Sequence, residues 1–165
     1  MNRAIIVCLL PFLFCPLITG CRNQEDYKRE IEQRGIAYTE KSFLEEVKAG
    51  DRGVVELFLK SGMDVNAKGA DGRAALLIAA EKGDREIVSM LIHHGADVNI
   101  RDIGGYTPLI YTAYRGDLAC AKLLLENGAD VHAKDKDGWT ALKYAFMNQN
   151  RDMADLLIKA GAKGK

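Results

Sequence analysis

A repeat of 33 residues is the feature that most restricts how this chain can fold. Gly-Asp pairs recur at that spacing, at Gly50-Asp51, Gly83-Asp84 and Gly116-Asp117. A second glycine follows the same period, at Gly62, Gly95, Gly128 and Gly161. A fixed period of this length is typical of a solenoid, in which each unit buries its apolar face only against its neighbours. Function is therefore expected on the surface that stacking leaves free.

The third unit shows the internal pattern most completely. It reads Asp102-Ile103-Gly104-Gly105-Tyr106-Thr107-Pro108-Leu109 and closes on Asn127-Gly128-Ala129-Asp130-Val131. Thr107 can cap a helix that begins at Pro108, because the first turn of a helix does not need the N–H that proline lacks. Gly116 suits a tight turn between two helices, since glycine tolerates positive φ. The pattern resembles the ankyrin repeat, which implies an all-α solenoid of about four helix-turn-helix units with β-turn fingers.

The resemblance covers an ankyrin-repeat domain at 42–165, with units at about 42–68, 69–101, 102–134 and 135–163. The first unit lacks the turn signature, and Ser42 followed by Glu45 predicts a capping box at a helix start. In the fourth unit, Gln149 stands where the inter-helix glycine is expected. Divergent first and last units are typical of end caps, because each has only one neighbour.

The first residues predict an export signal. Arg3 supplies a positive start, and Ala4 to Ile18 is apolar but too short for a comfortable membrane span. Ile18-Thr19-Gly20-Cys21 resembles a bacterial lipobox, which implies that 1–20 is removed and that Cys21 carries acyl chains such as palmitate. Two or more chains anchor firmly, since each buried methylene contributes about 0.8 kcal/mol. The alternatives are an ordinary signal peptide that ends in Gly-Cys and an uncleaved anchor.

The anchor would place the protein in a bacterial cell envelope, on the periplasmic side. Arg22, rather than Asp, after the cysteine favours the outer membrane over the inner one by the same resemblance. The segment 21–41 is charged, which predicts either a tether or a polar helix held by pairs such as Glu25–Arg29 and Glu30–Arg34. We favour a tether that partly docks on the first unit.

The residue inventory does not indicate an enzyme, a metal site or a cofactor. His93 and His94 are adjacent at a helix end, so they cannot chelate one metal as a pair four residues apart would. His132 occupies the slot of Asn66 and Asn99, which is expected to tie down a turn. The recurring aspartates are expected to cap the second helices: Asp51, Asp84 and Asp117. Cys120 lies in an apolar slot and is expected to be a buried small hydrophobe.

A partner-binding surface is expected at positions that vary between units. In ankyrin-type proteins, as the resemblance implies, partners dock on the concave side formed by finger tips and first helices. Residues at those positions include types enriched in binding hot spots: Arg73, Ile103, Tyr106, Tyr114, Arg115, Lys136, Trp139 and Met147. The alternative is that Tyr106 and Trp139 pack across adjacent fingers and stiffen the array. Tyr111 and Tyr144 share a slot with Ile78, and we expect them to pack between repeats.

Two functions from different classes follow. The first is a lipid-anchored extracytoplasmic module that binds one protein partner, most concretely an immunity protein that neutralises a toxic secreted enzyme such as a lipase. The second is a structural or chaperone-like envelope factor that supports another envelope protein. The 23 basic and 23 acidic side chains argue against a nucleic-acid partner, because such binders usually show a basic stripe. We expect a monomer.

Overall fold

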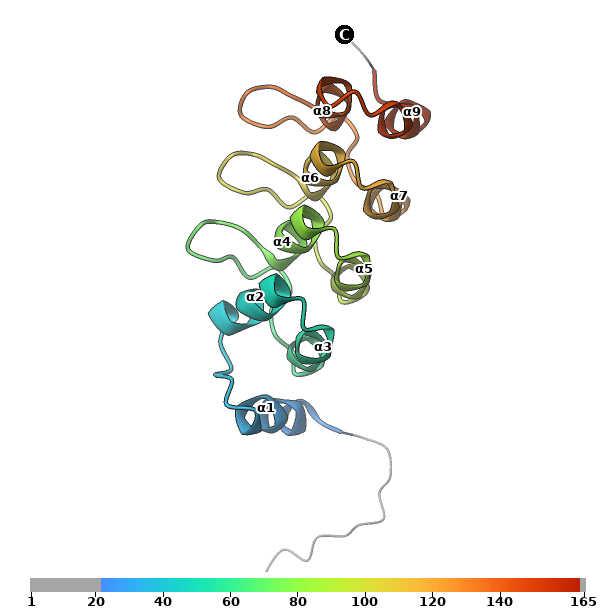
Figure 1. The fold of residues 1–165 in the computed structure, drawn as a ribbon. Helices are drawn as coiled ribbons and strands as arrows, with labels where there is room; N and C mark the ends of the chain where they lie inside the picture. The colour runs from blue at the N-terminus through green and yellow to red at the C-terminus, as the bar shows by residue number, and fades with distance from the viewer. Residues whose placement is uncertain (1–21, 164–165) are drawn as a thin grey trace, which may run out of the picture.

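The computed structural model describes residues 22–163, where it places nine helices and no strand. Helix α1 (Gln24–Gln33) is followed by four helix pairs: α2 (Glu40–Ala49) with α3 (Arg52–Lys60), α4 (Ala75–Lys82) with α5 (Arg85–His93), α6 (Pro108–Arg115) with α7 (Leu118–Glu126), and α8 (Ala141–Met147) with α9 (Arg151–Lys159). The pairs stack in one direction, with the first helices in one column and the second helices in another (Figure 1). The expected all-α solenoid of four helix-turn-helix units is confirmed.

The turn inside each pair is fixed by a side-chain cap on the second helix. The caps accept a hydrogen bond from the backbone N–H three residues later, at 3.0, 3.1, 3.0 and 3.0 Å for Asp51, Asp84, Asp117 and Asn150. The expectation for the three aspartates is confirmed. In the fourth pair Gln149 adopts a φ of 55°, where Gly116 of the third pair has 80°. A side chain in that left-handed region costs free energy, because its Cβ crowds the following carbonyl.

Three loops connect successive pairs: 61–74, 94–107 and 127–140. They project as fingers beside the column of first helices (Figure 1). At the end of the second finger, Thr107 accepts a hydrogen bond from the backbone N–H of Ile110 at 3.3 Å, and Pro108 opens α6 as expected. The second and third fingers are joined by the backbone N–H of Lys136, which donates to the Gly104 carbonyl at 2.9 Å.

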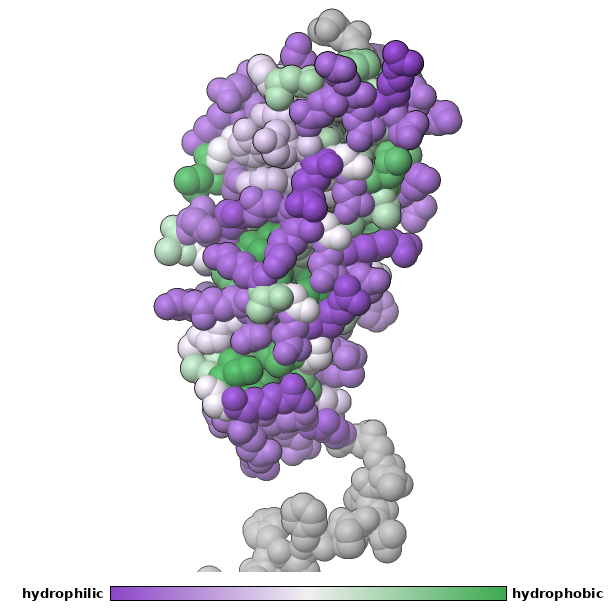
Figure 2. Space-filling view, in the orientation of Figure 1, coloured by the Kyte–Doolittle hydropathy of each residue, from purple (hydrophilic) through white to green (hydrophobic). Residues whose placement is uncertain are grey.

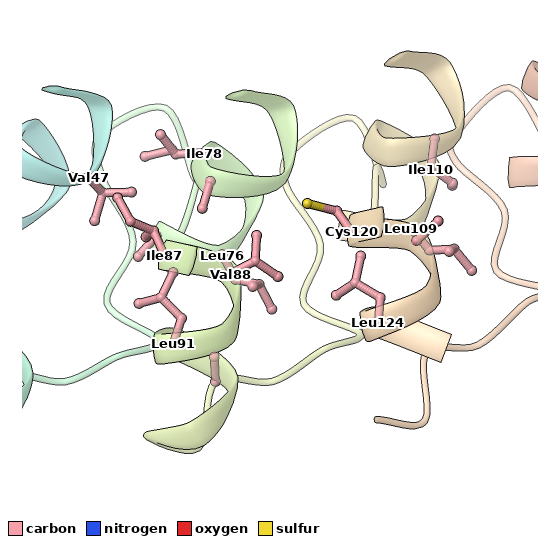
Figure 3. Close-up of a cluster of buried hydrophobic side chains, with 14 of the residues drawn as sticks. Val47, Leu76, Ile78, Ile87, Val88, Leu91, Leu109, Ile110, Cys120 and Leu124 are labelled. Atoms are coloured by element: carbon pink, nitrogen blue, oxygen red, sulfur yellow. The ribbon is translucent and has the colours of Figure 1, made fainter. Parts of the chain in front are cut away.

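The core is a continuous apolar layer that runs through the stack. Figure 3 shows its middle part, where Leu76 and Leu91 of the second pair and Leu109 and Leu124 of the third are labelled. These four leucines are at most 1% exposed. Burying each such side chain contributes roughly 1.5–3 kcal/mol, so the stack is held by neighbour-to-neighbour contact. Cys120 is fully buried in the same cluster, which confirms its expected role as a small hydrophobe.

The start of the first unit differs from the prediction. Thr39, not Ser42, caps α2: its Oγ1 accepts a hydrogen bond from the backbone N–H of Ser42 at 3.1 Å. Ser42 is therefore the third residue of the helix, and the predicted capping box with Glu45 does not form. The helix begins earlier because Glu40 and Lys41 tolerate helical conformation well and Thr39 supplies the cap that they need.

The segment after Cys21 is a helix and not the favoured tether. Ile31 of α1 is fully buried, and α1 packs against α3 of the first pair. The predicted Glu30–Arg34 ion pair is present at 2.9 Å. The predicted Glu25–Arg29 pair is wrong, because Glu25 binds Lys28 at 2.8 Å instead. Ile31 joins the buried core, and the half-buried rings of Tyr27 and Tyr38 pack against the same core.

The predicted signal segment 1–20 and the lipidation site Cys21 lie outside the described residues. Within residues 22–163, every helix is too short or too polar to cross a membrane. The anchor therefore stays a prediction from the sequence, and the described fold begins with the two residues that lead into α1 at Gln24.

Candidate functional site

The residues predicted to bind a partner all lie on one side of the stack. We call this side the finger-side surface and define it as the three fingers together with α4, α6 and α8 (Figure 1). The fingers carry Arg73, Ile103, Tyr106, Lys136 and Trp139, and the helices carry Tyr114, Arg115 and Met147. The repeat period therefore brings residues from three units onto one surface, as the sequence predicts.

Five of these residues are free to contact another molecule. Ile103, at the tip of the second finger, is 70% exposed, Tyr114 of α6 is 57% exposed and Met147 of α8 is 50% exposed. Tyr114 and Met147 occupy the same slot of successive units, and Arg115 and Lys136 are also exposed. Exposed large apolar side chains beside cations are a common composition at the centre of protein interfaces.

Tyr106 and Trp139 are only half exposed, because both pack on Tyr144 of α8. The ring centroids of Tyr106 and Tyr144 are 6.0 Å apart, and their hydroxyl oxygens share a hydrogen bond of 3.0 Å. Trp139 packs on Tyr144 from within the same unit, with ring centroids 5.4 Å apart. Tyr106 therefore packs between neighbouring units, but on a helix and not across adjacent fingers as the alternative interpretation had it, and neither ring is a freely standing anchor.

Two aspartates tie the second and third fingers to the helices that follow them. The Tyr111 hydroxyl donates to Asp102 Oδ2 at 2.8 Å, and the Tyr144 hydroxyl donates to Asp135 Oδ2 at 2.7 Å. The other carboxylate oxygen of Asp135 accepts backbone N–H groups of its own finger, those of Asp137 and Trp139, each at 2.9 Å. Tyr111 and Tyr144 thus have the packing role that their shared slot with Ile78 predicts.

Burial is the main cause of a raised pKa at both tyrosines, and the hydrogen bond to the aspartate raises the pKa further. At neutral pH the hydroxyls of Tyr111 and Tyr144 therefore stay protonated and donate. Sequence reasoning missed Asp102 and Asp135 as partners of these rings. The signal was present, because each aspartate precedes its tyrosine by nine residues, whereas the first finger has Gly69 and Ile78 in those slots.

Arg73 completes a row of stacked side chains along this surface. Its guanidinium lies 5.5 Å from the ring centroid of Tyr111 and forms an ion pair with Glu81. From Tyr111 the row continues to Tyr106, with ring centroids 5.4 Å apart, and then to Tyr144. We call Arg73, Tyr111, Tyr106, Tyr144 and Trp139 the aromatic row. The exposed Tyr114 packs edge-on against Tyr144 of this row.

The finger-side surface is different near α2, where it carries a groove of about 430 Å³. Its floor is apolar, with Leu44, Ala70 and Ile78, and its rim is charged, with Lys41, Lys48, Lys68, Glu40, Glu45 and Asp71. The groove exists because α2 has no finger before it and because Gly69 fills little of the space. No motif in the sequence indicated this groove separately.

The rest of the visible surface is largely hydrophilic, and hydrophobic residues form small separate groups on it (Figure 2). His93 and His94 are both exposed, with ring planes 80° apart. Across residues 22–163, no three His, Cys, Asp or Glu side chains are gathered as a metal site would need. What the described residues offer is a preformed contact surface.

Two family models match the chain. One, described as ankyrin repeats in three copies, matches residues 46–102. The other, described as ankyrin repeats in many copies, matches residues 91–145. Together they run from α2 into α8, and their overlap, 91–102, covers the end of α5 and the start of the second finger. No curated protein matches the chain.

Proposed function

The chain belongs to the ankyrin-repeat family, whose repeats form protein–protein interaction modules, and we propose that it binds one protein partner on its finger-side surface while anchored in a bacterial envelope. In its most concrete form, the proposal is an immunity protein that neutralises a toxic secreted enzyme such as a lipase. No catalytic step is assigned to the chain itself.

The observation that carries this proposal is the set of exposed side chains on the finger-side surface, of which Tyr114 packs on the aromatic row. Ile103, Tyr114 and Met147 offer apolar area without large rearrangement, and Arg115 and Lys136 lie on the same surface. The aromatic row is already fixed by hydrogen bonds and ring packing, so little of its conformational entropy remains to be lost on binding. A preorganised apolar surface of this kind favours capture of one partner over many weak contacts.

The envelope location rests on the sequence before α1. Ile18-Thr19-Gly20-Cys21 resembles a lipobox, and α1 begins at Gln24, three residues after the proposed lipidated cysteine. So short a link leaves the helix stack close to the membrane surface, where an envelope-directed enzyme would act. This proximity supports the inhibitor over a scaffold on a long tether.

The binding surface is tested by purifying partners from envelope extracts with the tagged chain and with two matched variants. We expect Tyr114→Ala combined with Met147→Ala to lose one stoichiometric partner. Lys122→Ala should retain it, because Lys122 is exposed but lies on α7, away from the finger-side surface. If the variant with both Tyr114→Ala and Met147→Ala still captures the partner, the finger-side surface is not where the partner binds. Several weak partners would instead favour the structural or chaperone-like role.

The anchor and the inhibitory role need separate measurements. Cys21→Ser should abolish incorporation of labelled palmitate and move the protein from the membrane to the soluble fraction; unchanged fractionation would refute lipid anchoring. If the captured partner is an enzyme, its activity should fall to a plateau at one equivalent of added chain. An active enzyme in the saturated complex would rule out neutralisation and leave the binding module intact.

A further inference from the structure

The C-terminal end of the stack carries a second surface, remote from the finger tips. A groove of about 440 Å³ lies between α8 and α9, and two large apolar side chains stand at it. Phe146 of α8 is 53% exposed and Ile158 of α9 is 48% exposed. Among residues 22–163, no further helix pair covers this face (Figure 1).

The repeat period shows what this face is built to contact. The slot of Phe146 is held by Ala80 and Ala113 in the second and third pairs, and both are fully buried. The slot of Ala154 is held by Val88 and Ala121, which are also fully buried. Inside the stack these positions lie against the neighbouring helix pair. The last pair therefore presents a surface of the stacking type, enlarged by the Phe146 ring.

Helix α9 contributes one continuous face to this groove. Arg151, Ala154, Asp155 and Ile158 line it and are spaced so that they fall on the same side of a helix. The small Ala154 lies in the middle, where it permits a second helix to approach closely. Opposite charges flank it at Arg151 and Asp155, and neither enters an ion pair within residues 22–163.

The slot of Arg151 also holds an arginine in the first and second helix pairs, and of these two Arg52 alone enters an ion pair within residues 22–163. Arg52 occupies that slot in α3. It reaches across the junction to the second pair, where it binds Asp84 at 3.3 Å and Glu86 at 3.0 Å. By the same geometry, Arg151 is placed to bind a carboxylate on a helix stacked against the end of the molecule.

We propose that this end face pairs two copies of the chain about a two-fold axis, with the two α9 helices antiparallel. In that arrangement Arg151 of each copy faces Asp155 of the other, and the two-fold axis produces this ion pair twice. A parallel arrangement would oppose like charges. Phe146 and Ile158 add apolar contact on either side of the ion pairs. This second surface goes beyond the proposed function and leaves the finger-side surface free, although it replaces the monomer that the sequence led us to expect.

The charge pattern gives a decisive test by sedimentation velocity of the full chain in a density-matched non-ionic detergent, at about 1 to 100 μM. The wild-type chain should dimerise. Arg151→Asp and Asp155→Arg should each raise the dissociation constant at least about tenfold. An equimolar mixture of the two variants should associate again, because one end face is then acidic and the other basic. Lys122→Asp, an exposed change on α7, is the matched control and should leave the dissociation constant unchanged.

Phe146→Ala supplies an independent variant and should also weaken association about tenfold, with the helical circular dichroism unchanged. The proposal is overturned if the wild-type chain stays monomeric over the whole range. It is equally overturned if both single charge reversals leave the dimer intact, or if their mixture fails to associate. Loss of partner capture by Tyr114→Ala with Met147→Ala bears only on the finger-side surface, so failure of either proposal can be told from failure of the other.

Discussion

The first finger and the last two fingers are attached to their helices by different chemistry. In the last two, Asp102 and Asp135 each accept a tyrosine hydroxyl from the following helix. In the first, the same slots hold Gly69 and Ile78, and Ile78 is only 2% exposed. A buried polar group without a partner costs about 1–3 kcal/mol. In these three units the two slots are therefore either both non-polar, as Gly69 and Ile78, or both hydrogen-bonding, as an aspartate and a tyrosine.

The difference also divides the finger-side surface into two regions. Towards α6 and α8 the paired tyrosines extend into the aromatic row, which is rigid and fills the space between fingers and helices. Towards α2 the glycine and isoleucine leave the groove of about 430 Å³. The proposed partner contacts Tyr114 and Met147, which lie in the rigid region. If the two regions are held differently, equivalent substitutions in them should change the free energy of unfolding by different amounts.

Truncation of the two equivalent side chains should give the largest contrast. Tyr144→Ala removes a ring that contacts Tyr106, Tyr114 and Trp139, and should lower the free energy of unfolding by about 3–5 kcal/mol. Ile78→Ala removes fewer atoms and no hydrogen bond, and should cost about 2–4 kcal/mol. Urea denaturation followed by circular dichroism measures both. If Ile78→Ala lowers the free energy of unfolding as much as Tyr144→Ala or more, the tyrosine-bearing region is not the more strongly held of the two.

Residues whose role is set by a local backbone conformation could be predicted from the sequence. The caps at Asp51, Asp84 and Asp117 and the helix start at Pro108 follow from rules that involve only a few neighbouring residues. The burial of Cys120 followed from the repeat period, because aligned slots share an environment. These predictions needed no knowledge of how the fingers fold.

Residues whose role depends on a contact between elements could not be predicted as well. The hydrogen bond of Tyr144 to Asp135 spans nine residues and requires the finger to fold back on the helix. Tyr106 looked like an exposed anchor, yet it packs on the next unit. Helix α1 packs against α3. Beside it, Tyr38 stacks on Phe58 of α3 with ring centroids 5.6 Å apart. Sequence periodicity does not encode the contacts of Tyr106 and of α1, whereas the Asp135–Tyr144 contact leaves a signal only when the aligned slots of three units are compared.

Removal of the Tyr144 hydroxyl should show how much its hydrogen bonds contribute to stability, apart from the packing of the ring. Tyr144→Phe keeps the ring but leaves Asp135, which is 7% exposed, and the Tyr106 hydroxyl without their partner. We expect a loss of about 1–3 kcal/mol in the free energy of unfolding. Tyr111→Phe should cost less, because Asp102 is only half buried and regains water. Denaturation of both variants checks this order, and the reverse order would contradict the assigned importance of burial.

Alkaline pH should weaken the tyrosine-bearing region selectively. Burial raises the pKa of Tyr144 above its usual value near 10. Below about pH 10 the hydroxyl is protonated in both the folded and the unfolded chain. Above it only the unfolded chain releases the proton, so the free energy of unfolding falls as pH rises. Between about pH 9 and 11, Tyr144→Phe should remove up to about 1 kcal/mol of that fall. An unchanged pH dependence in the variant would contradict a protonated, buried Tyr144.

The smallest effect is expected at the turn between α8 and α9, where the last unit again departs from the others. Gln149 has a φ of 55°, and a residue with a side chain pays about 1–2 kcal/mol to adopt this conformation. A glycine avoids that strain, but it loses more conformational entropy on folding, which costs about 0.5–1 kcal/mol. Gln149→Gly should therefore raise the free energy of unfolding by less than about 1 kcal/mol. The reciprocal change, Gly116→Gln, should lower it by more, because a Cβ at Gly116 would lie 2.5 Å from Asn150 Nδ2. If Gln149→Gly destabilises the chain, the Gln149 side chain makes a contact at the end face that outweighs its strained backbone.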